Sequence, residues 1–304
     1  MLKVRKSKKL LFEHYFLNHC TMVAILACIK NYNKLFLPCL EVCITTFCTL
    51  CCENCSNLMQ YYTKPYHVSI KKINNDISIV CNSVDGIDCL RILGGEPLLA
   101  PDLAELLEYV SGIEKIKNVV IITNGTMIFS NECLNILSKN RKFKISVSDY
   151  RNNSPKLTIL SAQLAKENIN YSIDKIIWRD KSNIACRNKS YKELKWTYQN
   201  CPNYFFSLLN GNLHICPRSS HGADLGIFSP DKDDFICVRD YSGKNGELRK
   251  RITKLLNRPF IVACDYCSEE QADRLPVVET AKQCTRDEAH KKFMDMIGRG
   301  LHVK

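Results

Sequence analysis

The chain has 304 residues, of which 45% are hydrophobic and 24% charged, so a short peptide, a fibrous repeat and a disordered chain are excluded. This length suits one enzyme-sized barrel or two unequal domains. A net charge of +12 leaves nucleic-acid binding open, while eighteen cysteines indicate either disulfides or bound metal.

The first 38 residues are expected to form an N-terminal helical extension. The segment begins with basic residues like an export signal, but polar side chains interrupt its apolar stretch and no small-residue cleavage site follows. The clean apolar run from Met22 to Ile29 is too short to cross a bilayer. We therefore expect a cytoplasmic protein without a membrane partner, and in a reducing cytosol the cysteines indicate metal rather than disulfides.

From residue 39 onward, strand and helix patterns alternate, which predicts a parallel sheet with crossover helices. Strands are expected at Leu40–Thr46, Cys89–Leu93, Val119–Ile122, Phe143–Ser148 and Ile169–Ile173. Helices are expected at Pro101–Gly112, from Ser130 to about Lys139, and from Ser154 to about Asn168. The fold class is therefore α/β, a partial (β/α) barrel over residues 39–183.

After residue 183 the pattern changes. The region from 201 to 267 has turn residues, a predicted hairpin through Asn210-Gly211-Asn212, and five cysteines. These features predict a small cysteine-rich α+β domain over residues 184–267, built around a metal centre. Residues 268–304 are expected to be a helical tail whose apolar face carries Ala289, Phe293, Met296 and Ile297.

Four cysteines lie within eight residues just after the first predicted strand. Of these, Cys48, Cys52 and Cys55 have the spacing C-x3-C-x2-C, which suits one iron–sulfur cluster whose fourth iron stays open to a substrate or cofactor. Buried thiols and a zinc site are the alternatives, but burial alone does not explain the density, and zinc would lack a fourth ligand nearby. The register is also open, because Cys48, Cys51 and Cys55 would fit a cluster too.

This motif, with Gly94-Gly95-Glu96-Pro97 at the end of the second predicted strand, resembles the radical S-adenosylmethionine (SAM) enzymes. The resemblance implies that SAM chelates the open iron of a 4Fe-4S cluster through its amino and carboxylate groups. It also implies that an electron from the reduced cluster cleaves the sulfonium to a 5'-deoxyadenosyl radical, which takes hydrogen from a substrate. Asn54 departs from the pattern, because many members have an aromatic residue there.

Polar residues end the predicted strands, at the edge where a (β/α) barrel places its active site. The candidate cofactor contacts are Gly94, Gly95, Glu96, Thr123, Asn124, Ser146 and Ser148. The glycines allow a close backbone approach to the methionine end of SAM, and Glu96 can accept a hydrogen bond from its ammonium. The resemblance implies that the two serines contact ribose or carboxylate. A solvated strand end is the alternative for the serines, and turn formation for Thr123 and Asn124.

A second cysteine group consists of Cys201, Cys216, Cys264 and Cys267, in the pattern C-x9-G-x4-C with a distant C-x2-C. It resembles the auxiliary-cluster twitch domain, a shortened relative of the SPASM domain. Four protein ligands close a 4Fe-4S cluster completely, which suits electron transfer, and zinc on the same thiolates is the alternative. We expect one auxiliary cluster, because the next cysteine is Cys284.

Eleven cysteines remain, and most are expected to be small apolar core residues. Cys186 and Cys237 are candidate hydrogen-atom donors, as a resemblance to radical epimerases would imply. Arg218 and His221, which follow Cys216, are candidates for substrate contact or for stabilising the anionic cluster. Two clusters on seven thiolates would lower the net charge to about +9. We therefore do not expect nucleic acid as a partner.

Together these features predict a radical SAM enzyme that oxidises, epimerises or rearranges a small polar, sugar-like molecule. The auxiliary cluster would accept an electron, and flavodoxin or ferredoxin would supply the first one. The twitch resemblance points to the chemistry of 2-deoxy-scyllo-inosamine dehydrogenase. One alternative is a protein or ribosomal-peptide maturase, although 38 residues before the first strand are few for peptide recognition. The other is a non-catalytic metal protein that binds nucleic acid, in which Gly94-Gly95-Glu96 would have no role.

Overall fold

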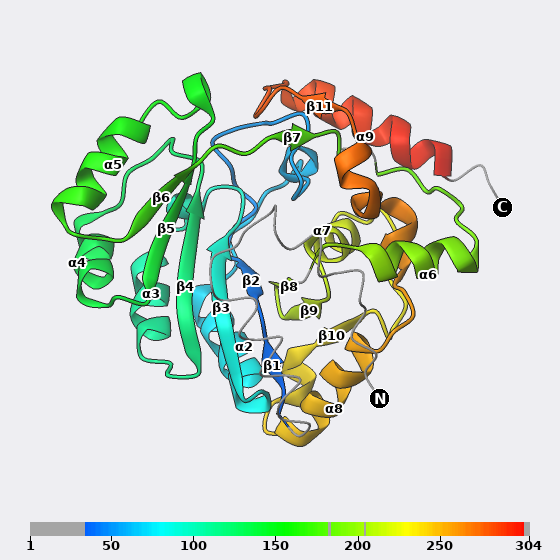
Figure 1. Cartoon of the computed structure of the whole chain (residues 1–304), viewed down its shortest axis with the longest axis horizontal. Coiled ribbons are helices and arrows are strands. Elements are labelled where there is room, and N and C mark those ends of the chain that lie inside the picture. The colour runs from blue at the N-terminus through cyan, green and yellow to red at the C-terminus, as the bar shows by residue number, and fades with distance from the viewer. Residues whose placement is uncertain (1–33, 182–183, 204, 301–304) are drawn as a thin grey trace.

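The computed structural model describes residues 34–181, 184–203 and 205–300, so most of the expected N-terminal extension lies outside the described residues. A nine-stranded sheet of order β10-β9-β8-β2-β3-β4-β5-β6, with β1 also paired to β3, runs through the molecule (Figure 1). Its strands are β1 Phe36–Leu37, β2 Leu40–Cys43, β3 Gly86–Leu93, β4 Ile116–Thr123, β5 Phe143–Ser148, β6 Tyr171–Asp174, β8 Phe206–Leu209, β9 Asn212–His214 and β10 Phe235–Cys237. All pairs from β8 to β6 are parallel, which confirms the α/β partial-barrel fold.

Helices α2 Ile70–Ser83, α3 Leu103–Ser111, α4 Asn131–Lys139 and α5 Leu157–Lys166 cover one face of this sheet (Figure 1). The strands alternate between two rows of side chains, because successive residues point to opposite faces. One row is fully buried with the helices: Leu90, Ile92, Val119, Ile121, Ile145 and Val147. The other row is half-buried and includes Arg91, Asn118, Val120, Lys144 and Ser146. The polar chemistry of the barrel therefore lies on the face away from its helices.

Local hydrogen bonds determine where helix α4 begins and where strand β2 ends. Helix α4 begins as expected, because the Ser130 side chain accepts a hydrogen bond from the N–H of Cys133 at 3.2 Å. Strand β2 ends earlier than expected, at Cys43. The hydroxyls of Thr45 and Thr46 both donate to the carbonyl of Tyr66 at 3.3 Å, so the chain has already turned into the following loop.

The sheet continues beyond the predicted domain boundary at residue 183. Strand β8 pairs parallel with β2, in the register Leu40 with Phe206 and Cys43 with Leu209. The predicted hairpin joins β8 to β9, and Asn210 and Gly211 at its turn have φ of 47° and 84°. The division into domains stays a prediction.

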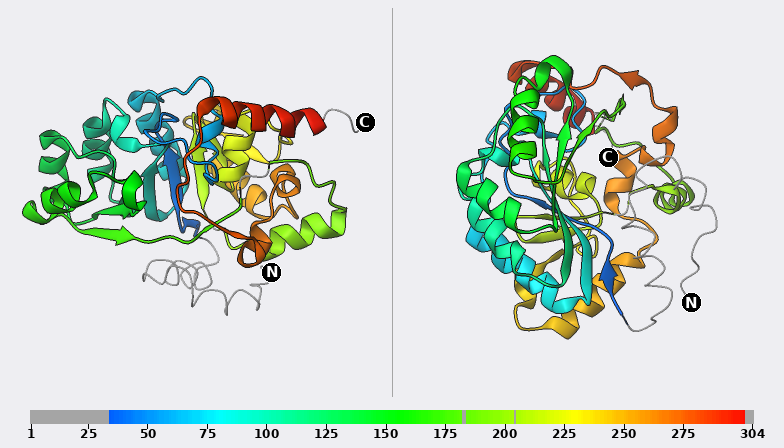
Figure 2. Two further views of the ribbon diagram at one scale, coloured as in Figure 1. Left: turned by 90° about the horizontal axis from the view of Figure 1, so that it is seen from above. Right: turned by 60° about the vertical axis from the view of Figure 1, so that its left-hand side comes forward.

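The C-terminal part adds helices α6 Tyr191–Asn200, α7 Pro217–Asp224, α8 Asn245–Leu256 and α9 Arg286–Gly300, the 3-10 helices η3 Met59–Tyr61 and η7 Val262–Tyr266, and a small sheet of β7 Trp178–Arg179 with β11 Val277–Val278. The apolar residues expected on one face of α9 pack against Leu58 and Tyr61. Figure 2 shows α9 beside the segment between β2 and α2. Within the described ranges, no helix is long and apolar enough to span a bilayer.

Candidate functional site

The segment from residue 44 to 58, here called the cysteine loop, leaves the carboxyl end of β2. It packs Cys48 and Cys55 against the same apolar cluster, and the Cys55 N–H donates to the Cys52 carbonyl at 3.3 Å. Cys52 is buried and the other two cysteines are half-buried. Burial, together with a smaller effect of the neighbouring Cys55 thiol, raises the pKa of Cys48 and of Cys52 to about 12. Burial also raises the pKa of Cys55, although backbone N–H groups from Met59 and its neighbours act in the opposite direction. The three predicted ligands are therefore brought together.

The donor set of the cysteine loop fits an iron–sulfur cluster. Closely spaced, buried thiols ionise only when a cation compensates them, and a metal centre supplies that charge. In the described part of the chain, no three Cys, His, Asp or Glu side chains are grouped to hold a single metal ion. Each thiolate of a 4Fe-4S cluster binds a different iron, so the sulfurs stand further apart than around one zinc ion. Three thiols would leave one iron open.

Cys51 has a different neighbour from the other cysteines of the loop. Its sulfur lies 3.7 Å from the sulfur of Cys284, which precedes α9. The Cys284 N–H also donates to the Cys51 carbonyl at 2.9 Å. This arrangement favours Cys52 over Cys51 as the middle ligand, and the register stays a prediction.

Gly94 and Gly95 hold the end of β3 directly against the cysteine loop. A Cβ atom on Gly94 would lie 2.2 Å from the carbonyl oxygen of Thr45, and one on Gly95 would lie 2.2 Å from that of Phe47. The N–H groups of Gly95 and Glu96 donate to the same two carbonyls at 2.9 and 2.8 Å. The absence of side chains thus permits contact between two strand ends. A contact of these glycines with SAM stays a prediction.

Glu96 ties the ends of β3 and β4 together. Its carboxylate is fully buried and accepts hydrogen bonds from Leu98 N at 3.1 Å, Thr123 Oγ1 at 2.9 Å and Asn124 N at 2.8 Å. Burial raises its pKa to about 7, while these hydrogen bonds act in the opposite direction. The Glu96 carboxylate thus accepts hydrogen bonds from groups of the protein itself. Its contact with the SAM ammonium also stays a prediction.

Asn124 extends this connection to the cysteine loop. Its amide nitrogen donates to Thr49 Oγ1 at 3.0 Å and lies 3.7 Å from the sulfur of Cys48. Its amide oxygen accepts from the backbone N–H of Thr126 at 3.0 Å, as in the turn that the sequence suggested. Asn124 therefore combines the turn with a direct contact to a predicted cluster ligand.

The ends of β5 and β6 supply polar groups to the same edge of the sheet. Ser146 Oγ donates to Asp174 Oδ2 at 2.5 Å, and the Ser148 carbonyl accepts from Ser154 Oγ at 3.1 Å. Burial raises the pKa of Tyr150, and Cys55, Cys52 and Cys48 raise it further, so this tyrosine lies close to all three cysteines.

Sequence reasoning missed Tyr150 and Asp174. Asp174 directly follows the predicted strand Ile169–Ile173, and Tyr150 lies two residues after the predicted strand Phe143–Ser148, which was the available signal. The ring of Tyr150 meets that of Trp178 edge-on, with centroids 5.5 Å apart. The cysteine loop therefore has an aromatic wall on one side and the Ser146–Asp174 pair on the same sheet edge.

The second cysteine group is assembled from three elements. Cys201 follows α6, Cys216 caps the N-terminus of α7, and Cys264 and Cys267 lie in and just after η7. Burial raises the pKa of Cys201 and Cys264 to about 12 and that of Cys216 far above its ordinary value, and the thiols of this group raise one another's pKa values. The structure therefore brings the four predicted auxiliary ligands together.

Two backbone N–H groups point at sulfurs of this second group. Ser219 donates to Cys216 Sγ and Glu269 to Cys267 Sγ, both at 3.4 Å. The positive end of the α7 dipole also favours negative charge at Cys216. These donors fit thiolates that carry the charge of a bound cluster.

Lys189 holds the chain between Cys264 and Cys267. Its ammonium donates to the carbonyl of Cys264 at 3.1 Å, to that of Cys267 at 2.7 Å and to Thr197 Oγ1 at 3.0 Å. A positive charge thus lies beside two of the four predicted ligands. The sequence contained no signal for this role, because the lysine lies 75 residues before Cys264.

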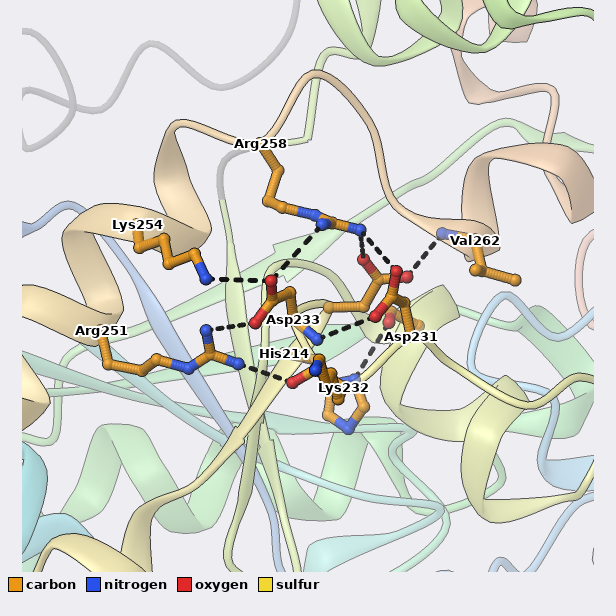
Figure 3. Close-up of polar contacts among 10 residues, drawn as sticks. His214, Asp231, Lys232, Asp233, Arg251, Lys254, Arg258 and Val262 are labelled. Carbon is orange, nitrogen blue, oxygen red and sulfur yellow. Dashed lines mark hydrogen bonds and ion pairs between the residues drawn. The ribbon is translucent and has the colours of Figure 1, made fainter.

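A network of three acidic and three basic residues also anchors this segment through Val262 (Figure 3). Its centre is Asp234, whose carboxylate accepts from Val262 N at 2.7 Å and from Arg258 at 2.6 Å. Asp233 pairs with Arg251 and Lys254 at 2.5 and 3.0 Å. Because Val262 begins η7, this network positions the segment that carries Cys264.

The predicted substrate contacts on α7 make internal contacts. His221 is buried, and its Nδ1 lies 2.9 Å from the hydroxyl of Tyr62, which also donates to Asp224 at 2.9 Å. Burial, together with a smaller effect of the neighbouring His214, lowers the pKa of His221 to about 3. Arg218 donates to the carbonyl of Lys181 at 2.5 Å. Contact of either residue with substrate stays a prediction.

The two candidate hydrogen donors lie in different parts of the fold. Cys186 Sγ lies 3.2 Å from Asp265 Oδ2, so this thiol is beside the second cysteine group. Cys237 lies on β10, at the edge of the sheet, opposite Asn212. The structure does not gather them at one place, and their role stays a prediction.

Comparisons with known proteins agree with this geometry. Residues 42–175 match the family model described as the radical SAM superfamily. The GTP 3',8-cyclase of Aquifex aeolicus is 31% identical over 120 residues, which cover 38% of this chain and 36% of that protein. The GTP 3',8-cyclase of Alkaliphilus oremlandii is 33% identical over 90 residues, or 29% of this chain and 28% of that protein. The chain thus matches about a third of the length of these relatives.

One solved structure shares the fold over more of the chain. The structure described as native anSMEcpe with bound AdoMet has a TM-score of 0.50 at 13% identity, and the alignment covers 88% of this chain and 98% of that one. BtrN in complex with AdoMet and 2-DOIA has a TM-score of 0.43 at 18% identity, covering 81% of this chain and 99% of that one. The first of these likenesses extends the shared fold past residue 175.

Proposed function

We propose that this chain, whose residues 42–175 match the family model of the radical SAM superfamily, cleaves SAM reductively and takes a hydrogen atom from a small polar substrate. The observation that carries the proposal is the convergence of Cys48, Cys52 and Cys55 at the carboxyl edge of the parallel sheet. That edge is where (β/α) barrels perform their chemistry. A one-electron donor such as flavodoxin or ferredoxin would supply the reducing electron.

Each group around the cysteine loop has a proposed task. The three thiolates hold a 4Fe-4S cluster and leave one iron for SAM, and together these cofactors supply a 5'-deoxyadenosyl radical. Asn124, Gly94 and Gly95 keep the loop against the strand ends by the contacts given above. Tyr150 limits the access of water on one side of the thiols, because this half-buried residue lies close to them. The residues of the chain thus bind the cluster, hold the cysteine loop in place and shield the thiols from water.

The half-buried face of the sheet supports a polar substrate. Ser146, Ser172 and Asp174 form a hydrogen-bonded group on this face, with distances of 2.5 and 3.4 Å to the aspartate. Hydroxyls and a carboxylate suit a ligand rich in hydroxyl groups, such as a sugar-like molecule or a nucleoside. GTP belongs among the substrates to test, because the curated relatives named above are GTP 3',8-cyclases.

We further propose that Cys201, Cys216, Cys264 and Cys267 hold a second 4Fe-4S cluster that accepts an electron. Four protein ligands leave no open iron, which suits electron transfer rather than substrate chelation. Loss of a hydrogen atom and then an electron and a proton would turn a substrate alcohol into a carbonyl. Epimerisation or rearrangement would instead return a hydrogen atom to the substrate radical.

Anaerobic reconstitution tests the cofactor content. We expect about eight irons and eight sulfides per chain, and about four of each after Cys48, Cys52 and Cys55 are all replaced by Ala. The matched control is Cys133→Ala, which removes a buried thiol on α4 outside both groups. Stoichiometric zinc without sulfide would contradict the proposal, as would eight irons in the triple variant.

Deuterated candidate substrates test the substrate class. Deuterated aminocyclitols, GTP and a cysteine-containing peptide would be incubated separately with reconstituted protein, SAM and dithionite. Transfer of deuterium into 5'-deoxyadenosine, measured by mass spectrometry, identifies the molecule that loses hydrogen. Transfer from the peptide alone would overturn the small-molecule proposal and favour a maturase.

A further inference from the structure

The chain just before α9 pairs with the cysteine loop through an isolated antiparallel bridge. The N–H of Glu53 donates to the carbonyl of Lys282 at 2.8 Å, and the N–H of Cys284 donates to the carbonyl of Cys51 at 2.9 Å. Between these bonds, Cys52 and Gln283 face each other as an antiparallel bridge. A segment more than 200 residues away in sequence is thus paired with the backbone of a predicted cluster ligand.

The side chain of Gln283 makes three contacts at this bridge. Its amide oxygen accepts from the backbone N–H of Cys51 at 2.8 Å. Its amide nitrogen donates to the sulfur of Cys52 at 3.2 Å and to the carbonyl of Ala281 at 2.6 Å. The last contact fixes the direction of the amide, because a flipped amide would place its oxygen against the Ala281 carbonyl.

This geometry has an electrostatic consequence for a cluster bound through Cys52. An N–H group that points at a cysteine sulfur stabilises the more negative, reduced form of the cluster, and hydrogen bonds to the sulfurs are among the factors that set cluster potentials. Cys52 is buried, so if the Gln283 amide were removed, water could not freely take its place as a hydrogen-bond donor to the sulfur. The packing of α9 on Tyr61 and Leu58 holds the donor's chain in place.

We propose that Gln283 is a positioning residue for the SAM-cleaving cluster, which fixes the Cys51–Cys52 backbone and raises the reduction potential through its hydrogen bond to the Cys52 sulfur. The inference rests on the proposed function. It gives the C-terminal helical tail a task beyond packing, since the tail carries a donor to a cluster ligand.

Three variants separate the two contacts of Gln283. Gln283→Leu removes both the acceptor for Cys51 and the donor for Cys52. Gln283→Glu keeps an oxygen acceptor for Cys51 but removes the donor. Gln271→Leu is the matched control, because it makes the same substitution at an exposed glutamine of the C-terminal region.

The first measurement uses the reduced apoprotein and needs no cluster. The rate at which iodoacetamide alkylates Cys52 is followed by peptide mass spectrometry. We expect Gln283→Leu to speed this reaction several-fold, with Gln283→Glu and Gln271→Leu no faster than wild type. An unchanged rate in Gln283→Leu would overturn the positioning role.

The second measurement uses the reconstituted protein. The midpoint potential of the SAM-sensitive cluster is measured by redox titration, with the electron paramagnetic resonance signal that changes when SAM is added as its readout. We expect a lower midpoint potential in Gln283→Leu and in Gln283→Glu. The midpoint potential of Gln271→Leu should equal that of wild type. If Gln283→Leu does not bind iron, Gln283→Glu decides the question, and a wild-type potential there overturns the electrostatic role.

The two proposals fail in different ways. A wild-type protein without any SAM-sensitive signal would overturn the proposed function, and the alkylation rates would still decide whether Gln283 positions Cys52. A wild-type signal with unchanged potentials in both Gln283 variants would overturn only the role of Gln283 in setting the potential.

Discussion

A Cβ atom on Gly95 would lie 2.7 Å from the Cβ of Cys48. The end of β3 and the first predicted cluster ligand therefore occupy positions that only a glycine allows, and the backbone hydrogen bond from Gly95 to Thr45 fixes them at that separation. The cysteine loop therefore packs directly against the Gly-Gly-Glu sequence at the end of β3.

The first prediction follows from this contact. Gly95→Ala should displace the cysteine loop and lower SAM cleavage by about a hundredfold, the cost of misplacing a reacting group by roughly 1 Å. The iron content should fall toward the four irons of the auxiliary site. Gly246→Ala in α8 is the control, because no atom lies within 4 Å of its added Cβ. Normal cleavage by Gly95→Ala would show that the loop tolerates the shift.

Lys189 provides a prediction for the second cysteine group. Lys189→Met removes the donor to the carbonyls of Cys264 and Cys267 and should destabilise this segment by about 2 kcal/mol, as expected for hydrogen bonds from a charged group. We expect loss of auxiliary iron with SAM cleavage retained, while Lys192→Met, on the exposed side of α6, keeps both. Full iron content in Lys189→Met would contradict this role.

The lowered pKa of His221 predicts that the stability of the protein depends on pH. Its folded pKa of about 3 lies below the ordinary histidine value of about 6.5, so the unfolded chain takes up the proton more readily. The contribution of neutral His221 to the free energy of unfolding is therefore complete above pH 6.5 and is lost as the pH falls toward 3. The loss amounts to about 1 kcal/mol between pH 7.5 and 5.5. Anaerobic thermal unfolding should show a smaller drop over this range for His221→Gln than for wild type. Equal drops would assign the effect to other groups.

The register of the cysteine loop is tested by two neighbouring substitutions. Cys52→Ala should abolish 5'-deoxyadenosine formation, because it breaks C-x3-C-x2-C and removes the sulfur that Gln283 contacts. Cys51→Ala should keep measurable formation, since that sulfur lies against Cys284. The opposite result would move the middle ligand to Cys51.

The role of the auxiliary site is tested by replacing Cys264 and Cys267 together with Ala. Reductive cleavage of SAM should continue, because the cysteine loop is untouched, whereas oxidised product should disappear. Product formation at the wild-type rate would refute electron acceptance by this cluster and direct the search to hydrogen donors, with Cys186 and Cys237 first.

Periodic and motif-bearing features were predictable from the sequence, whereas long-range contacts were not. The strand at Phe143–Ser148 has the predicted bounds, because its residues alternate and turn residues flank it. Helix α2 was missed although Ile70, Ile73, Ile77 and Val80 recur at helical spacing. The pairing of β8 with β2 and the contact of Gln283 with Cys52 join residues far apart in the chain, so no local pattern encodes them. The first cysteine group was predictable because its spacing is local, and the second because its spacing resembles a known domain pattern.

The most direct test of the central claim is the formation of 5'-deoxyadenosine and methionine from SAM by the reconstituted protein with dithionite. We predict that wild type forms the two products in equal amounts and that the Cys48, Cys52 and Cys55 triple Ala variant forms neither, while it retains the auxiliary iron. Equal product formation by the triple variant, or none by a wild type that carries both clusters, would contradict the assignment of these three cysteines to SAM cleavage.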